Sequence, residues 1–184
     1  ISHVVKKAEE ANIGEVIVAA EDQEIIDDVK KNGGDAILTS NNHKTGTDRI
    51  YEALKKIGKS DIELVMNLQG DEPLMDIGDI RNLHNQMVKT KSEMGTLASK
   101  IKDKSFFQKE NVVKVLTKQS LTNLEFSEAI NFMRKSGNLI ENVYHHLGIY
   151  CYKVEILKNF VSLNQSPNEI KNRFCLLYTS PSPR

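Results

Sequence analysis

The sequence predicts an α/β protein with a three-layer α/β/α arrangement around a mostly parallel, doubly wound sheet. Residues 16–20 and 36–39 are short apolar runs with the length and composition of buried strands. Between these runs, apolar residues from Ile25 to Val29 follow helical spacing, and Gly33-Gly34 is a typical helix end. Strand and helix alternating through short links are typical of a doubly wound parallel sheet.

The composition restricts the kinds of partner that the protein can have. The 184 residues suffice for one domain, and 25 Lys and Arg balance 25 Asp and Glu. Without a basic field we expect no nucleic-acid partner, and an anionic ligand has to be held by local donors. Cys151 and Cys175 fit no metal spacing, and no run reaches the roughly 18 apolar residues of a membrane span. A soluble cytoplasmic protein without a membrane partner is the expectation.

Both ends of the chain have unusual sequences. Ile1 is followed at once by a helical pattern, so we expect the chain to begin inside an element rather than before it. Residues 175–184 break from the preceding composition and resemble translated sequencing adapter. We therefore expect a domain at residues 1–174 that is truncated at both ends, and a non-native read-through tail at residues 175–184.

A polar loop at residues 39–49 leads into a helix whose start is well specified. Thr45 and Asp48 have the spacing of a capping box. Hydroxyls, backbone N–H groups around Gly46 and the Arg49 side chain are donors that a nucleotide base or phosphate needs at a helix N-terminus. A capped solvent loop explains Thr45, Gly46 and Asp48 equally well. It explains Arg49 poorly, because a cation in the first turn opposes the helix dipole and calls for an anionic partner.

A carboxylate follows the next apolar run. Residues 64–68 are expected to form a buried parallel strand, and Gly70, Asp71 and Pro73 come directly after it. Ligands of open α/β sheets bind outside the carboxyl ends of the strands, which is where a hard cation or a phosphate-bearing substrate would meet Asp71. By itself, this stretch is better explained as a strand followed by an ordinary Gly-Asp turn.

The middle of the chain gives further elements and one unassigned segment. Asp76 can cap a helix, and residues 95–101 and 112–116 are expected strands. Lys114 interrupts the second strand, so it must either snorkel or face a polar site. Residues 124–141 have the least regular pattern and could form a lid or a dimer contact. The buried side of the capped helix is expected to consist of Ile77, Ile80, Leu83, Met87 and Val88.

Residues 142–152 form a strand with two different faces. Alternation puts Val143, His145, Leu147, Ile149 and Cys151 on a core face, and Tyr144, His146, Gly148, Tyr150 and Tyr152 on the other. On the second face, His146 and Tyr150 flank Gly148, whose missing side chain leaves room for a ligand. An aromatic face against a helix layer explains the tyrosines. It gives no reason for a histidine beside a glycine, so we favour a site.

Three segments in order now suggest a family. His-Lys-Thr-Gly-Thr-Asp-Arg at residues 43–49, Asn-Leu-Gln-Gly-Asp-Glu-Pro at 67–73 and His-His-Leu-Gly-Ile-Tyr at 145–150 together resemble the 3-deoxy-manno-octulosonate (Kdo) cytidylyltransferases, or CMP-Kdo synthetases. The similarity extends from about Ile1 to Arg173. It implies a Rossmann-like sheet of the nucleotide-diphospho-sugar transferase type. It also implies a Mg²⁺-dependent transfer of CMP from CTP to Kdo, which gives CMP-Kdo and pyrophosphate for the lipopolysaccharide inner core.

The resemblance assigns the first segment to the nucleotide. It implies that Thr45, Gly46 and Thr47 hold the cytosine. Arg49 would lie near the substrates as a catalytic residue.

The other two segments are assigned to the metal and the sugar acid. The resemblance implies that Asp71 is a catalytic residue and the Mg²⁺ ligand. Gln69, His146 and Tyr150 would bind Kdo, with His146 orienting the sugar acid rather than serving as an obligatory base.

The sequence also departs from the family. The Arg/Gly/Lys phosphate loop that opens these enzymes and a C-terminal aspartate segment are not matched, and Glu128 stands where an arginine is usual. We therefore expect an internal fragment that is itself inactive, from a parent enzyme for which the resemblance suggests a homodimer. The open alternatives are another sugar or sugar-acid nucleotidyltransferase, such as a CMP-sialate synthetase, and a non-catalytic α/β domain.

Overall fold

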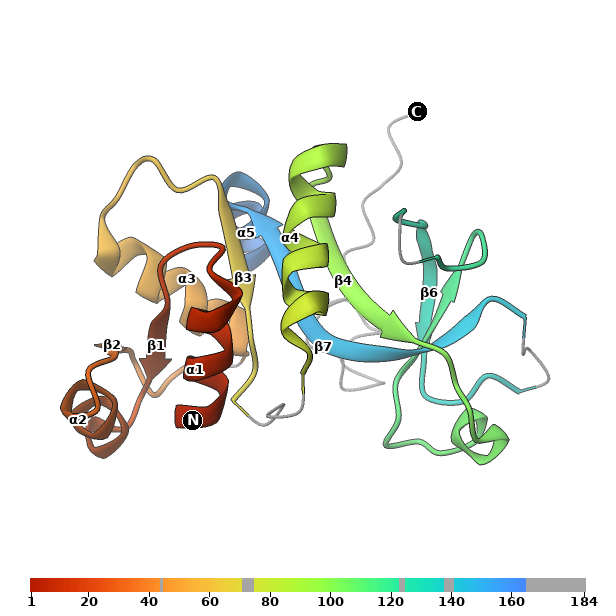
Figure 1. The fold of residues 1–184 in the computed structure, drawn as a ribbon, viewed down its shortest axis with the longest axis horizontal. Coiled ribbons are helices and arrows are strands. Elements are labelled where there is room, and N and C mark those ends of the chain that lie inside the picture. Colours follow the sequence, from red (N-terminus) through yellow and green to blue (C-terminus); the bar gives the residue numbers. More distant parts are fainter. Residues whose placement is uncertain (44, 71–74, 123–124, 138–140, 165–184) are drawn as a thin grey trace. The chain divides into compact units, whose positions relative to one another are not determined.

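The computed structural model describes residues 1–43, 45–70, 75–122, 125–137 and 141–164, and the chain divides into two compact units (Figure 1). The first unit comprises Ile1–Leu97 and Gly148–Val161, and the second comprises Ala98–Leu147 and Ser162–Arg184. Asp71 and the predicted read-through tail at 175–184 lie outside the described residues.

The first unit contains the predicted strand–helix–strand arrangement. Strand β1 (Ile17–Ala20) pairs in parallel with β2 (Asp35–Leu38), and α2 (Gln23–Lys31) connects them. Asp22 caps α2 by accepting a hydrogen bond from the Glu24 N–H group at 2.9 Å. The helix buries Ile26 and Val29 against the small side chains of β1 and β2. The parallel pairing and its crossover helix confirm this part of the prediction.

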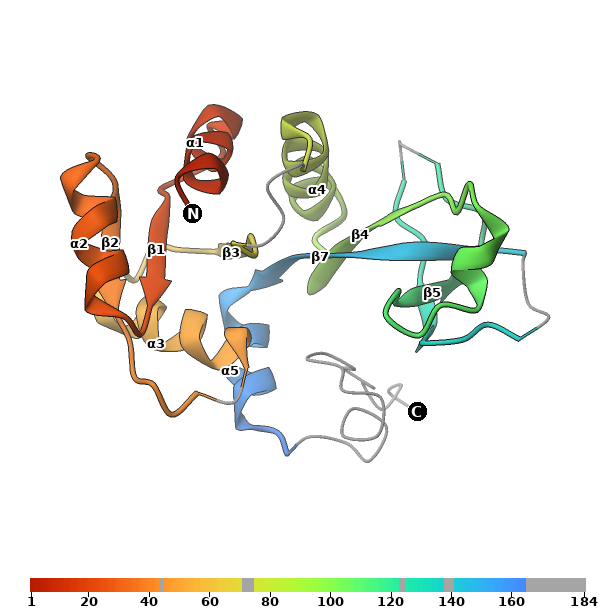
Figure 2. The same cartoon turned by 90° about the horizontal axis from the view of Figure 1, so that it is seen from below.

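Four further helices cover the strands of the first unit. On one side lie α1 (Ser2–Ala11) and α4 (Ile77–Thr90), and on the other lie α3 (Gly46–Ile57) and α5 (Val154–Ser162), as Figure 2 shows. Helices α1 and α4 pack together, and Arg81 of α4 donates to the Ala11 carbonyl at the end of α1 at 3.0 Å. This unit therefore has the predicted helix, strand and helix layers.

The third strand corrects one part of the predicted sheet. Strand β3 (Leu64–Asn67) pairs antiparallel with β7 (Val143–Lys153), from Leu64 opposite Lys153 to Asn67 opposite Tyr150. Strand β4 (Met94–Ser99) also pairs with β7, and the Thr96 hydroxyl donates to the Ile149 carbonyl at 2.7 Å. The α/β class is confirmed, with β1 and β2 in a parallel two-stranded sheet and β3 in a second sheet that contains antiparallel pairs. The parallel orientation predicted for β3 is wrong, because β3 runs antiparallel to β7. A short apolar run indicates burial and says nothing about the direction of its partner.

The second unit contains an antiparallel arrangement. Strand β5 (Lys114–Thr117) pairs with β6 (Ala129–Met133) and with residues 143–145 of β7, and a short 3₁₀ helix, η1 (Lys104–Phe107), precedes it. Strand β6 lies inside the segment that the sequence left irregular. Its first three residues are exposed, so backbone pairing rather than an apolar pattern defines this strand.

Lys114 lies fully buried in the second unit. Its ammonium group donates to the Val112 carbonyl at 2.8 Å and also to the carbonyls of Lys109 and Arg134. Burial lowers its pKa, and the neighbouring Arg134 contributes in the same direction. Of the two predicted alternatives, Lys114 therefore faces a polar site, which consists of three carbonyl groups from the preceding turn and the end of β6.

Helix α4 confirms three of the five predicted buried positions, and Ile77 is only half-buried. Ile80, Leu83 and Met87 are buried, whereas Val88 is 57% exposed and its predicted burial is wrong. Among the helices of the described residues, none combines the length and the apolar character that crossing a membrane requires.

Candidate functional site

The ends of β1 and β2 meet at one edge of the first unit. Thr39, the residue after β2, donates its N–H group to the Ala20 carbonyl at 2.8 Å and its hydroxyl to the same oxygen at 3.1 Å. Glu21 follows β1 at this edge, and the loop that begins with Thr39 leads into α3. The carboxyl ends of parallel strands are where ligands of such sheets bind.

The predicted capping box at the start of α3 is confirmed. The Thr45 hydroxyl oxygen accepts the Asp48 N–H group at 3.2 Å, and the Asp48 carboxylate accepts the Thr45 N–H group at 3.1 Å. A side chain at Gly46 would meet nothing within 4 Å, so the backbone of the first turn is open there. Thr47 is only 2% exposed. The helix start thus offers backbone N–H groups, while the Thr47 side chain is buried beneath them.

Arg49 has a protein partner for its charge. One guanidinium nitrogen forms an ion pair with Glu21, and another donates to the Thr39 hydroxyl at 2.8 Å. The anionic partner that the sequence predicts for Arg49 is therefore a residue of the chain itself. This agrees with the alternative explanation of the segment as a capped solvent loop. A guanidinium group carries five N–H donors, so further donors remain for a substrate oxygen.

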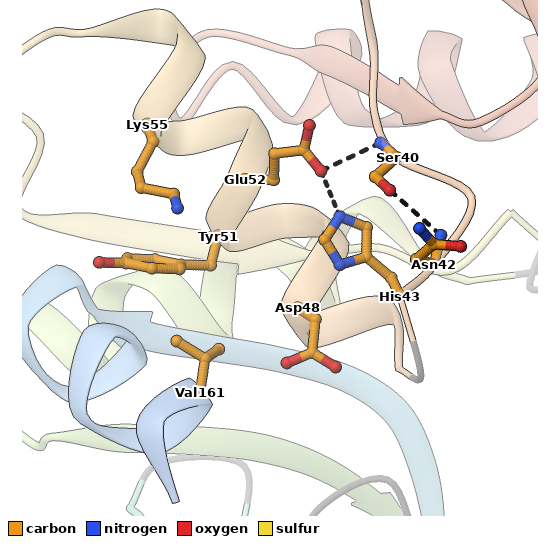
Figure 3. A pocket seen from close by; sticks show the side chains of 8 residues that line it. All are labelled: Ser40, Asn42, His43, Asp48, Tyr51, Glu52, Lys55 and Val161. Carbon is orange, nitrogen blue, oxygen red and sulfur yellow. Dashed lines mark hydrogen bonds and ion pairs between the residues drawn. The ribbon is translucent and has the colours of Figure 1, made fainter.

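An open hollow of about 590 Å³ lies beside this loop, between the loop, α3 and the end of α5 (Figure 3). His43 forms a hydrogen-bonded pair with Glu52 across the hollow's wall, and Lys55 lies over the ring of Tyr51 at 4.9 Å from its centroid. The lining side chains belong to Ser40, Asn42, His43, Asp48, Tyr51, Glu52, Lys55 and Val161.

No role is predicted from the sequence for Glu52 or Glu21. The available signal for Glu52 was its spacing of four residues from Lys56, which predicts an ion pair along the helix. Nothing in the sequence paired Glu21 with Arg49, because the two are 28 positions apart.

Gln69 and Gly148, from two of the three resembling segments, are in contact. A methyl group built on Gly148 would lie 3.1 Å from Gln69 Nε2 and 3.2 Å from its Cδ and Oε1. The space that the missing side chain leaves is therefore occupied by the Gln69 amide. Among the predicted sugar-acid residues, Gln69 lies against the same strand that carries Tyr150.

Tyr150 lies opposite Asn67 in the β3–β7 ladder and is 8% exposed. Its ring stacks on that of Tyr152, with 6.1 Å between the centroids, and Tyr152 contacts Phe160 of α5. An aromatic face packed against a helix, the alternative explanation of the tyrosines, is thus present. Whether Tyr150 also contacts a ligand stays a prediction.

His146 lies in the second unit, where it is almost completely buried. Its backbone N–H group donates to the Val113 carbonyl at 2.9 Å, and its ring makes an edge-to-face contact with the Phe132 ring, with 5.0 Å between the centroids. Burial lowers its pKa to about 4, and the neighbouring His145 adds to the effect. At neutral pH the ring is uncharged, so it can act toward an anion as a hydrogen-bond donor and not as a cation.

The predicted metal ligand cannot be placed in this site, because Asp71 lies outside the described residues. Within the described ranges, no group of three His, Cys, Asp or Glu side chains could hold a metal ion. Glu128, which stands where the family usually has arginine, forms a surface ion pair with Lys118 at 3.1 Å.

Comparisons with known proteins agree on one family. A family model described as cytidylyltransferase matches residues 1–178. The 3-deoxy-manno-octulosonate cytidylyltransferase of Photorhabdus laumondii is 34% identical over 175 residues, which cover 92% of this chain and 70% of the relative. That of Thermodesulfovibrio yellowstonii is 40% identical over 177 residues, covering 90% and 69%.

A solved structure is similar over most of this chain. It is a CMP:2-keto-3-deoxy-manno-octonic acid synthetase complexed with CTP. It matches with a TM-score of 0.82 and 30% identity, over 94% of this chain and 70% of that chain.

Proposed function

The chain belongs to the cytidylyltransferase family, and we propose that its activity is the transfer of CMP from CTP to Kdo, with release of pyrophosphate. The observation that carries this proposal is the similarity, at 30% identity and a TM-score of 0.82, to a synthetase of this kind complexed with CTP. Relatives that are 34% and 40% identical and carry the same enzyme name support it.

The nucleotide end of the proposed reaction relies on the start of α3. The capping box fixes the first turn, and the open backbone at Gly46 lets a base or phosphate approach its N–H groups. Thr45 and Gly46 are thus suited to holding the cytosine through the backbone. The Thr47 side chain is buried, so it would stabilise that turn by packing rather than contact the base directly.

The reaction is a substitution at phosphorus. The anomeric hydroxyl of Kdo attacks the α-phosphorus of CTP, an oxygen–phosphorus bond forms, and the bond to pyrophosphate breaks. Negative charge develops on the phosphate oxygens, so the protein contributes mainly positioning and electrostatic stabilisation. Glu21 and Thr39 already hold the Arg49 side chain in place, so binding a substrate costs little further side-chain entropy. The remaining N–H groups of Arg49 can donate to these oxygens.

The sugar-acid end is assigned to Gln69, Tyr150 and His146. Gln69 is held against Gly148, and its amide can both donate and accept hydrogen bonds. A neutral His146 would donate an N–H group to the Kdo carboxylate or a hydroxyl group. Such a role agrees with an orienting residue better than with a general base, because a pKa near 4 makes the imidazole a weak base.

We include Mg²⁺ in the proposal, with Asp71 as its ligand. Carboxylates and phosphate oxygens are the ligands that Mg²⁺ prefers, and the metal would neutralise charge on the triphosphate. The described residues supply no metal-binding cluster, so Asp71 is the sole residue of this chain that we assign to the ion. The cytoplasmic location, the role in lipopolysaccharide synthesis and the homodimer likewise remain predictions.

The test is a pyrophosphate-release assay with the complete gene product that carries this sequence. CTP, Mg²⁺ and Kdo are expected to give pyrophosphate and CMP-Kdo, whereas N-acetylneuraminate in place of Kdo is expected to give none. Turnover with N-acetylneuraminate but not with Kdo would favour a CMP-sialate synthetase. No turnover with any sugar or sugar acid would favour the non-catalytic alternative.

A further inference from the structure

Glu52 holds the loop before α3 to the side of that helix. One carboxylate oxygen, Oε2, accepts the Ser40 N–H group at 3.0 Å and also a hydrogen bond from His43 Nε2. The other oxygen, Oε1, pairs with Lys56 one turn further along the helix, at 2.7 Å. Oε1 is thus used by the helix, and Oε2 binds the two loop residues, as Figure 3 shows for Ser40 and His43.

These bonds also fix the hydrogen on the His43 ring. They lower the pKa of the Glu52 carboxyl to about 2, with the hydrogen bond from Lys56 as the largest cause, followed by those from His43 and Ser40. An ionised carboxylate only accepts hydrogen bonds, so His43 must carry its hydrogen on Nε2. Figure 3 shows the ring between the Glu52 and Asp48 carboxylates, at the wall of the hollow.

The rest of the loop is fixed at its two ends. Thr39 is bound to β1, and Thr45 is bound to the first turn of α3 by the capping box. Between them, Glu52 provides the short contacts from described residues outside the loop, and Arg49 adds a long contact of 3.5 Å to the Ser40 carbonyl. A helix-internal ion pair explains the bond between Glu52 and Lys56. It does not explain why the second oxygen binds two loop residues.

We propose that Glu52 is a positioning residue for the nucleotide. Through its bonds to Ser40 and His43, Glu52 holds the loop that places Thr45–Thr47 next to the cytosine. This inference rests on the proposed function, because it requires that the loop bind CTP. Glu52 itself is assigned no contact with either substrate.

The test measures CTP affinity and steady-state kinetics in the complete gene product. Glu52→Ala is expected to weaken CTP binding about tenfold, the size of one charge-assisted hydrogen bond, while kcat and the KM for Kdo stay within about twofold. Glu52→Gln is expected to restore part of the affinity, because its amide oxygen can still accept the Ser40 N–H group. The matched control is Glu155→Gln, a change at an exposed residue of α5.

Two further variants separate positioning from a general structural role. Lys56→Met removes the helix-internal pair and the 2.7 Å bond from Lys56 to the Leu38 carbonyl of β2. It leaves both contacts of Glu52 with the loop, so it is expected to keep CTP affinity within about twofold. His43→Ala combined with Glu52→Ala is expected to weaken CTP binding no more than Glu52→Ala alone, because both act through one contact. Thermal unfolding of each variant shows whether it folds, and Glu52→Gln replaces Glu52→Ala if the latter does not.

The outcomes distinguish this inference from the proposed function. If the wild-type protein binds no CTP, the proposed function fails and the inference with it. If the wild type binds CTP and the Glu52 variants bind it equally well, the function stands and the inference is wrong. An equal loss of CTP affinity in Lys56→Met, or additive effects of His43→Ala and Glu52→Ala, would also overturn it.

Discussion

The side-chain amide of Gln69 lies against the backbone of Gly148. Three atoms of that amide would come within 3.1–3.2 Å of a methyl group at Gly148, which is closer than an ordinary van der Waals contact. Gln69 follows β3, and Gly148 lies within β7, the strand that pairs with β3. A side chain at position 148 would thus displace the Gln69 amide, which occupies the space that the sequence pattern assigns to a ligand.

Gly148→Ala is expected to impair sugar-acid binding. The added methyl group displaces the Gln69 amide by a few tenths of an ångström. If Gln69 binds Kdo as proposed, the KM for Kdo rises about tenfold while the KM for CTP is unchanged. Steady-state kinetics with each substrate varied in turn measure both values.

Gly14→Ala is the matched control for this substitution. A methyl group at Gly14 would meet nothing within 4 Å, so this variant is expected to keep wild-type kinetics and stability. The contact would have no role in sugar-acid binding if Gln69→Ala raised the KM for Kdo and Gly148→Ala left it unchanged.

Local patterns in the sequence were sufficient for the elements that neighbouring residues determine. The capping box of Thr45 and Asp48, the helix end at Gly33-Gly34 and the β1–α2–β2 arrangement were all predicted, because each depends on residues close together in the chain. Their positions fix the edge at which the candidate site lies.

Contacts between distant residues could not be predicted in the same way. The antiparallel direction of β3 depends on β7, and strand β6 is held by pairing with β5 rather than by burial. The sequence predicts an anionic partner for Arg49 without identifying it, and the partner is Glu21 at the end of β1. Such choices depend on tertiary packing, which periodicity and propensity do not report.

Lys114→Met is expected to lower the free energy of unfolding by about 3 kcal/mol, because it leaves buried carbonyl groups without their donor. The carbonyls of Lys109, Val112 and Arg134 all accept from the Lys114 ammonium group. Lys118→Met is the control. Lys118 is 65% exposed and its surface pair with Glu128 is expected to contribute less than about 1 kcal/mol. Urea unfolding of both variants measures the two changes in the free energy of unfolding. Equal losses of stability in the two variants would contradict a structural role for Lys114.

Asp71→Asn is expected to reduce turnover of the complete enzyme by about 10²–10³-fold, because the amide removes the charge that would hold Mg²⁺ next to the triphosphate. The fold is expected to survive, since the substitution keeps the shape of the side chain. Asp61→Asn, at an exposed position, is the matched control and should leave turnover unchanged. Pyrophosphate release and the dependence of rate on Mg²⁺ concentration measure the effect. Near-normal turnover of Asp71→Asn would remove Asp71 from the metal site.

The stability of the protein is expected to depend on pH through His146. Burial lowers its pKa in the folded state from 6.5 to about 4, so the folded protein takes up this proton less readily than the unfolded chain does. As the pH falls from 7 to 5, the unfolded chain binds the proton and the folded state does not, which lowers the free energy of unfolding by about 2 kcal/mol.

The carboxylates whose pKa values are lowered do not account for a loss of stability in this pH range. Hydrogen bonds from Lys56, Ser105 and Lys135 lower the pKa values of Glu52, Asp103 and Glu110 in the folded state. The stability that these carboxylates contribute is therefore present above the ordinary carboxyl pKa of about 4 and is lost only as the pH falls below that value. Urea unfolding at pH 7 and pH 5 should therefore show the loss in the wild type and not in His146→Gln. His145→Gln should keep most of it, because burial and not the charge of His145 is the larger cause. The same loss in His146→Gln as in the wild type would mean that a protonated His146 is accommodated in the folded state.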